Sequence, residues 1–352
     1  MNFSTRILSL ALVLCIGSFT ATRGVQAQSQ FRGMTVGSDV IQDYVDLRTF
    51  GANLIAFQIA RSDGGAEPTD EQYNAFLTAK LLVLDQIVTT AEANGMQILV
   101  ILFAPPGGMN TSVSPQQHRL CGGSDYSTQF VAAWQTIATR YKGRSGIYGY
   151  DLLNEPAVGK IGTGVTLWNT LSQQALAAIR VIDTSVKVVI EPPYGNPDFL
   201  NKLARISDTN IAYSFHSYFT SAFRNQGLNG RPINVPYPKA NKKDPKKGFN
   251  RKSLLKSVSK ANTFQRIRKG ARILSGEFAA PRWAPNGSAA RYIRDSIAIF
   301  ERFKWDWANH AWREADVWSP EHSNDPNDSA RSVAETDRAK VLKSFFKKNI
   351  FS

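Results

Sequence analysis

The segment IYGYDLLNEP, residues 147–156, joins a short strand-like run to a polar end. Residues 147–153 predict a buried strand, and they run directly into Asn154, Glu155 and Pro156. A carboxylate that follows a buried strand, between an amide and a rigid proline, is held in place and poorly solvated. Such a carboxylate suits a general acid. The structural alternative is a helix start, where proline is favoured in the first turn.

The same alternation of short apolar runs and longer helical patterns continues on both sides of this segment. Further strands are predicted at residues 31–35, 53–58, 96–103, 186–190, 211–215, 271–275 and 305–308. Helices are predicted at residues 71–94, 127–141, 165–183, 253–269, 288–303 and 330–349. Strands that alternate with helices indicate a parallel sheet covered on both faces, and about eight such units favour an α/β fold of the (β/α)8 TIM barrel type. An open doubly wound sheet is the alternative, but Gly33, Gly37 and Gly51 do not form its Gly-rich nucleotide-binding pattern.

The first 27 residues predict a secretory signal peptide. Arg6 precedes an apolar run at residues 7–19, and Val25-Gln26-Ala27 is a small-residue cleavage site. The apolar run is shorter than the roughly 20 residues that span a bilayer. We therefore expect export, with a secreted or periplasmic location, and one catalytic barrel over residues 28–352. At 43% hydrophobic and 20% charged residues, the composition is that of a globular protein and excludes disorder.

Polar side chains also end two other predicted strands. Residues 272–275 run into Gly276 and Glu277, and residues 211–215 run into His216-Ser217-Tyr218. In a barrel the carboxyl ends of the strands form one mouth, where strands four and seven face each other. Paired carboxylates are the working groups of glycoside hydrolysis, and a separation of about 5 Å makes the reaction retaining. Each residue alone has a structural alternative, as a cap or an ion-pair partner.

Three motifs, LLNEP (152–156), FHSY (215–218) and LSGEF (274–278), together resemble glycoside hydrolase family 5, the cellulase group of retaining barrel glycosidases. The resemblance implies that Glu155 is the acid/base and Glu277 the nucleophile. It also implies that Asn154 holds the sugar 2-hydroxyl, and that His216 and Tyr218 tune the two carboxylates. The family uses no metal and no organic cofactor.

Two positions depart from the family pattern. Ala56 stands where the family has an arginine on the second strand, and Phe103 stands where it has a histidine after the third. Both missing groups normally donate hydrogen bonds around the nucleophile, and bonds to a charged acceptor are worth about 1.5–3 kcal/mol each. We therefore expect a raised pKa and poorer orientation for Glu277. Arg61, five residues after Ala56, is the candidate replacement.

Aromatic side chains favour a sugar-binding cleft, because the apolar faces of sugars stack on rings. Residues 305–318 hold four of the seven tryptophans. The family has a tryptophan after strand eight, so Trp312 is the predicted platform under the cleaved sugar. Trp283 and Tyr194 are further substrate-binding candidates. The spacing of the histidines near residues 310–322 matches no metal-ligand pattern, so no metal site is predicted.

The net charge of +14 is concentrated in one segment. Residues 239–272 contain thirteen lysines and arginines and a single acid, Asp244. This basic segment overlaps a predicted basic insertion around residues 219–252. A solvated surface is the plain explanation; the functional one is an anionic polymer or envelope surface near the cleft. Nucleic acid is the weakest partner, since no nucleic-acid motif is present.

The sequence thus favours a secreted, monomeric retaining hydrolase of β-linked polysaccharide, most of all an endo-β-1,4-glucanase acting on β-glucan. β-1,3-Glucanase, β-mannanase and transglycosylase activities of the same family stay open, because loops decide linkage specificity. A catalytically weakened, carbohydrate-binding barrel is the second hypothesis, favoured by the missing arginine and histidine. A polyanion-binding envelope protein that uses residues 239–272 is the third.

Overall fold

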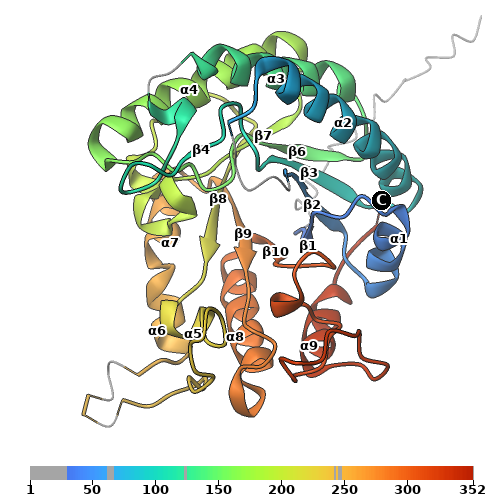
Figure 1. Cartoon of the computed structure of the whole chain (residues 1–352), viewed down its shortest axis with the longest axis vertical. Helices are drawn as coiled ribbons and strands as arrows, with labels where there is room; N and C mark the ends of the chain where they lie inside the picture. Colours follow the sequence, from blue (N-terminus) through green and yellow to red (C-terminus); the bar gives the residue numbers. More distant parts are fainter. Residues whose placement is uncertain (1–29, 62–66, 123–124, 242, 245–247, 352) are drawn as a thin grey trace, which may run out of the picture.

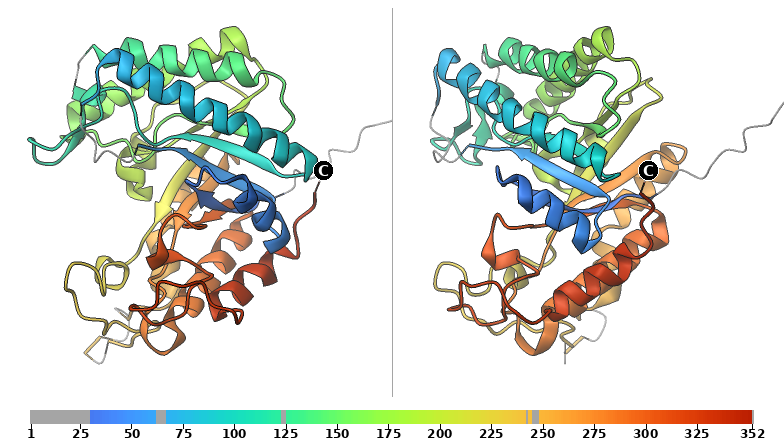
Figure 2. Two further views of the ribbon diagram at one scale, coloured as in Figure 1. Left: turned by 45° about the vertical axis from the view of Figure 1, so that its right-hand side comes forward. Right: turned by 90° about the vertical axis from the view of Figure 1, so that its right-hand side faces the viewer.

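The computed structural model describes residues 30–61, 67–122, 125–241, 243–244 and 248–351. Its centre is a closed barrel of eight parallel strands with helices packed around the outside (Figure 1; two further views in Figure 2). The order around the barrel is β1, β2, β3, β6, β7, β8, β9 and β10, so strands consecutive around the barrel follow one another along the chain. The predicted TIM barrel is confirmed. The predicted signal, residues 1–27, lies outside the described residues.

Each barrel strand coincides with a predicted apolar run to within a few residues. The strands are β1 (Arg32–Val36), β2 (Leu54–Ile59), β3 (Gln97–Leu102), β6 (Ile147–Asp151), β7 (Lys187–Ile190), β8 (Ile211–Ser217), β9 (Arg272–Phe278) and β10 (Asp306–Asn309). A small hairpin, β4 (Met109–Asn110) and β5 (Gln117–His118), lies in the loop after β3. The loop that follows β3 therefore has structure of its own beside the barrel mouth.

The outer layer consists mainly of helices. They are α1 (Ile41–Phe50), α2 (Asp70–Ala93), α3 (Tyr126–Tyr141), α4 (Ile161–Ile182), α5 (Ser221–Arg224), α6 (Arg251–Ser257), α7 (Ser259–Ile267), α8 (Ser288–Phe303) and α9 (Asp337–Phe346). At the start of α2, Thr69 and Gln72 form a reciprocal capping box. The helix predicted over 253–269 is divided at Val258, and the one predicted over 330–349 is only α9. None of the helices in the described ranges has the length and apolarity to cross a membrane.

Two apolar regions hold this architecture together. Inside the barrel, small and branched side chains such as Leu54, Ala56, Ile101 and Leu274 fill the space between the strands. A larger core lies between the strands and the helices, and five buried tryptophans belong to it: Trp134, Trp168, Trp305, Trp307 and Trp312. The barrel is therefore a packed core rather than a pore, and ligands are confined to its ends.

The amino-terminal end of the barrel is closed by a polar network. Asp306 at the start of β10 accepts hydrogen bonds from the Tyr148 hydroxyl at 2.7 Å and from Arg272 Nη2 at 2.8 Å. The backbone N–H of Phe31 donates to the same carboxylate at 2.8 Å. One carboxylate thus connects β1, β6, β9 and β10 at the floor of the barrel.

The basic segment, residues 239–272, runs along the outside of the barrel from one end to the other. It begins in the long loop after β8, at the mouth, and ends at the start of β9, at the floor, because parallel strands require this return (Figure 1). Lys242, Lys246 and Lys247 lie outside the described residues. The segment as a whole is therefore not beside the mouth, contrary to the sequence-based expectation; its last residues lie at the opposite end.

Substitution of Asp306 by alanine should lower the free energy of unfolding by about 3–5 kcal/mol, because it leaves the half-buried Arg272 guanidinium without its ion pair. Urea unfolding followed by circular dichroism measures the change. The control is Asp198→Ala, which breaks the exposed pair of Asp198 with Lys260 and should cost under about 1 kcal/mol. Equal losses in the two variants would contradict the role given to the floor network.

Candidate active site

The two predicted catalytic glutamates lie together at the mouth of the barrel. Glu277 is the sixth residue of β9 and is buried, whereas Glu155 follows β6 by four residues and its side chain is 42% exposed. Carboxylate oxygens of the two residues lie within 4.8 Å of each other. The prediction that Glu155 is poorly solvated is wrong, because it sits at the open side of the site. Its backbone has a φ of 42°, in the left-handed region that few residues other than glycine adopt.

A β-bulge aims Glu277 into the barrel. Phe215 of β8 pairs with Ser275 of β9, but the next residue, His216, pairs with Glu277. Gly276 is therefore the extra residue, and it lets Glu277 face inward opposite His216. A Cβ at Gly276 would lie 2.4 Å from Ser214 Oγ and 3.3 Å from His216 Nε2, so only glycine permits this close approach.

The buried His216 connects three glutamates. Its Nδ1 lies 2.7 Å from Glu155 Oε1 and 3.6 Å from Glu277 Oε2, and its Nε2 lies 3.1 Å from Glu191 Oε1. Burial opposes the charged imidazolium, but the charges of Glu191 and Glu277 and the bonds to Glu155 and Glu191 raise the pKa of His216 well above its usual value. His216 is therefore a cation that donates from both ring nitrogens.

Glu191 was not among the predicted site residues. It follows β7 directly and is almost completely buried, and its Oε2 accepts the backbone N–H of Glu155 at 2.9 Å. This bond fixes the unusual backbone of Glu155. The argument from polar residues at strand ends could have found Glu191, since Glu191-Pro192 follows a strand as Glu155-Pro156 nearly does. Below it, burial and then the charge of Glu191 raise the pKa of Asp151, so Asp151 is neutral.

Two neutral side chains orient Glu277. The Tyr218 hydroxyl donates to Glu277 Oε2 at 2.7 Å, and Gln58 Nε2 donates to Glu277 Oε1 at 3.3 Å. Burial, followed by the charge of Glu277, raises the pKa of Tyr218 well above its usual value, so Tyr218 stays a donor. Gln58 lies two residues after Ala56 on β2, and therefore faces the same side of the strand, one layer nearer the mouth.

The expected rise in the pKa of Glu277 is wrong. Burial does oppose ionisation, but the positive charges of His216 and His310 and the Tyr218 hydrogen bond outweigh it, so the pKa is lowered. His310 follows β10, and its Nδ1 lies 2.7 Å from Thr35 Oγ1 and 3.1 Å from Glu314 Oε1. Burial lowers the pKa of His310, but the charge of Glu277 and the hydrogen bond to Glu314 outweigh burial, so the pKa is raised. His310 thus supplies charge that the absent arginine would have supplied.

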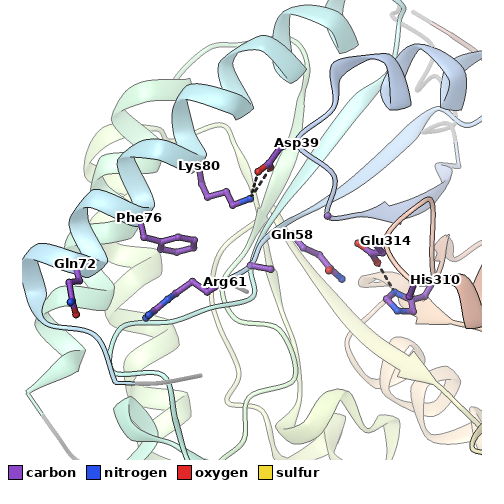
Figure 3. Close-up of a pocket in the computed structure, with 11 residues that line it drawn as sticks. Asp39, Gln58, Arg61, Gln72, Phe76, Lys80, His310 and Glu314 are labelled. Atoms are coloured by element: carbon purple, nitrogen blue, oxygen red, sulfur yellow. Dashed lines mark hydrogen bonds and ion pairs between the residues drawn. The ribbon is translucent and has the colours of Figure 1, made fainter. Parts of the chain in front are cut away.

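A cavity of about 690 Å3 has Gln58 and His310 in its wall (Figure 3), and Gln58 connects it to Glu277 through its hydrogen bond. Its far side is formed by α2, where Lys80 pairs with Asp39 at 2.7 Å and Phe76 faces the opening. Arg61 extends toward Phe76 and away from Gln58, with its guanidinium 5.8 Å from the centre of the Phe76 ring. Arg61 therefore belongs to the cavity wall near Phe76.

Of the aromatic residues predicted to bind sugar, one lies in the core and the others lie near the mouth. Trp312 is 1% exposed and donates to the Asp43 carbonyl, so it packs behind α1 and cannot be the sugar platform. Trp318 instead lies at the mouth: it is half-buried, and its ring centre lies 6.2 Å from that of Tyr218 and 6.4 Å from that of His310. The sequence shows four tryptophans around strand eight, two of them after it, but not which one lies at the mouth.

Three other predicted residues lie around this centre. Asn154 is buried next to Glu155, and its Oδ1 has no hydrogen-bond partner among the described residues. The Tyr194 hydroxyl donates to the Gly159 carbonyl at 2.8 Å, and Trp283 Nε1 donates to the Gln226 carbonyl at 2.8 Å. Both rings are half-buried and fasten loops of the mouth. Phe103, in place of the family histidine, is 39% exposed at the end of β3.

Glu155, His216 and Glu277 also form the set of described residues whose oxygen and nitrogen atoms lie close enough to hold a metal ion. His216 uses both ring nitrogens on carboxylates and is cationic, whereas a metal ligand must be a neutral imidazole. The donor set therefore suits proton transfer and covalent chemistry better than metal binding.

The chain is similar in sequence to a known family of enzymes and to several of its members. The family model described as Cellulase (glycosyl hydrolase family 5) matches residues 23–316. Endoglucanase 3 of Fibrobacter succinogenes is 24% identical over 266 residues, which cover 72% of this chain and 38% of the relative. The major extracellular endoglucanase of Xanthomonas campestris is 28% identical over 162 residues, covering 44% and 32%. The chain spans less than half the length of these curated relatives.

Solved structures share the fold. Thermotoga maritima Cel5A, in complex with mannotriose, has a TM-score of 0.68 at 19% identity, over 89% of this chain and 97% of that one. The cellulose synthase subunit Z of Clostridioides difficile has a TM-score of 0.68 at 19% identity, over 89% and 99%. Both likenesses concern the barrel itself.

The charge of His310 should be visible in the titration of Glu277. In His310→Gln, Glu277 loses a neighbouring cation, so its pKa should rise and its ionised fraction at acidic pH should fall. Carboxyl 13C NMR of protein labelled at glutamate measures the change. The control is His322→Gln, which alters a buried histidine bonded to Ser319 and Ser329 instead. An unchanged Glu277 titration in His310→Gln would contradict the electrostatic role.

Proposed function

Since the chain belongs to the cellulase family, glycosyl hydrolase family 5, we propose that it hydrolyses a β-linked glucan by double displacement through Glu277 and Glu155. The observation that carries the proposal is the pair of carboxylates within 4.8 Å, one buried and one half-exposed. This spacing is shorter than the roughly 6.5–9.5 Å that an inverting reaction needs for the substrate and the attacking water together, so it suits a retaining reaction.

In the first step, the Glu277 carboxylate attacks the anomeric carbon while Glu155 gives its proton to the departing glycosidic oxygen. The bond from the anomeric carbon to that oxygen breaks, and a bond to Glu277 forms. In the second step, Glu155 takes a proton from water, whose oxygen displaces Glu277. Tyr218 and Gln58 hold Glu277 in line, and His216 fixes one oxygen of Glu155, which leaves the other for the proton.

Several features favour a polysaccharide substrate, most of all a β-1,4-glucan attacked within the chain. The cavity beside Gln58 and His310 extends the site on one side, and Trp318 offers a ring next to Tyr218. Relatives named as endoglucanases support the same substrate. β-1,3-Glucanase, β-mannanase and transglycosylase activities are the alternatives within the family. We also propose that the protein is a monomer and that residues 1–27 direct its export. N-terminal sequencing of the exported protein should then identify Gln28 as the first residue.

The two glutamates should be distinguishable by azide rescue on an activated aryl β-cellobioside. Glu155→Ala with azide should give the β-glycosyl azide, because azide attacks the intermediate held on Glu277. Glu277→Ala with azide should give the α-glycosyl azide by direct attack. Anomeric 1H NMR identifies each product. The exposed Glu335→Ala is the matched control and should retain full activity. Identical products from the two variants would contradict the assignment.

The weakened carbohydrate-binding barrel is the competing function, favoured by Ala56 and Phe103. Wild-type protein should release reducing ends from at least one of cellulose, mixed-linkage glucan, β-1,3-glucan and mannan. Binding to one of these glycans without any release would overturn hydrolysis in favour of the binding protein.

Removal of the Trp318 ring should raise KM for a soluble glucan about two- to tenfold, because one aromatic stacking contact is worth roughly 0.5–1.5 kcal/mol. Steady-state kinetics of Trp318→Ala measure the effect. Trp312→Phe is the control: it alters the core behind α1, so it should lower the unfolding midpoint and leave KM unchanged. The platform assignment fails if the two substitutions exchange these effects.

A further inference from the structure

A second cavity lies at the end of the barrel opposite the catalytic mouth. Its volume is about 610 Å3, and it is bounded by the starts of β7 and β9, the end of α7 and the loop that leads into β8. We call it the floor cavity; its lining is Lys187, residues 205–211, Tyr213 and residues 268–272. None of these residues belongs to the active site.

The charges around the floor cavity are strongly unbalanced. Its lining includes five cationic side chains and one acid, Asp208. Arg180 Nε lies 2.7 Å from Asp208 and neutralises it, and Arg272 pairs with Asp306 in the floor network. The other cations form no ion pair with any residue in the described part of the chain; they are Lys187, Arg205, Arg268 and Lys269.

The environment of Lys187 shows that the excess of positive charge around the floor cavity has an electrostatic cost. Its ammonium lies at the start of β7, half-buried, 4.7 Å from the centre of the Tyr148 ring. Burial, followed by the charge of Arg272, lowers the pKa of Lys187 to about 8, against the opposing charge of Asp306. An anion in the cavity would relieve the repulsion and stabilise the charged lysine.

The walls indicate what kind of anion fits. Arginine guanidinium groups bind oxyanions through paired N–H donors, and Ser207, Thr209 and Asn210 add hydroxyl and amide groups. Ile206, Ile211 and Tyr213 provide apolar surface, which a small inorganic ion would not use. We propose that the floor cavity binds a multivalent oxyanion, and that the carboxylates of an acidic oligosaccharide are the source. Such a site would hold the enzyme on an acidic glycan and leave the mouth open to its substrate.

The test is a calorimetric titration of the full chain with tetragalacturonate at low ionic strength, with cellobiose, a product of the proposed reaction, present to occupy the catalytic cleft. The test variant is Arg205→Gln/Lys269→Asn; asparagine suits the left-handed backbone of Lys269, whose φ is 53°. Affinity should fall about tenfold, because two exposed ion pairs are lost. The control, Lys252→Gln/Lys256→Gln, removes the same charge from exposed positions of α6 outside the cavity and should bind within twofold of wild type.

Both double variants should hydrolyse neutral glucan at the wild-type rate, which separates this site from the catalytic one. Absence of tetragalacturonate binding, or equal losses in test and control variants, would overturn the proposal. A second titration uses tripolyphosphate, whose oxygens offer the same charge without a sugar. If tripolyphosphate binds more weakly than tetragalacturonate, the result supports an acidic oligosaccharide as the ligand. If tripolyphosphate binds equally or more tightly, the acidic oligosaccharide is overturned as the ligand. Because the proposal does not depend on hydrolysis, inactivity toward every glucan would leave it standing.

Discussion

The hydrogen bonds of His216 are the constraint on which the active site depends. One buried imidazolium lies between Glu155, Glu191 and Glu277, and in its absence burial would force some of these carboxylates to take up protons. The three glutamates come from the ends of β6, β7 and β9, and the histidine from β8, so four neighbouring strands converge on one ring. The barrel brings the three carboxylates together, and the positive charge of the imidazolium offsets their mutual repulsion.

The region around Glu277 shows how one interaction can be replaced by several weaker ones. Ala56 removes the family arginine, yet Gln58 donates to the same carboxylate from one layer higher on the strand. His310, whose pKa is raised by the charge of Glu277 and by Glu314, adds a positive charge from β10, which is separated from β2 only by β1. A hydrogen bond from β2 and a positive charge from the end of β10 thus replace the stabilisation of Glu277 that a single guanidinium would give. With these two contributions, Glu277 retains a lowered pKa.

The sequence predicts the barrel well because apolar runs and helical periodicity are local signals. It also predicts the central residues, since Glu155, His216, Tyr218 and Glu277 follow or end strands. Other features depend on contacts between distant segments, and no local pattern carries them. Strict alternation along β9 would direct Glu277 away from the interior face of Leu274, and only the bulge reverses this. Trp312 and Trp318 have similar surroundings in sequence, and packing against α1 decides which one is buried.

Gly276 makes the direction of Glu277 a matter of residue count. Ser275 and Glu277 pair with the consecutive residues Phe215 and His216 of β8, so a strand without Gly276 would still turn Glu277 inward in regular register. A regular strand that keeps Gly276 would instead turn Glu277 toward the helices. Over evolutionary time, a related barrel can therefore direct the same carboxylate into its mouth with one residue fewer in this strand, and sequence alignments of such barrels are expected to place a one-residue gap here.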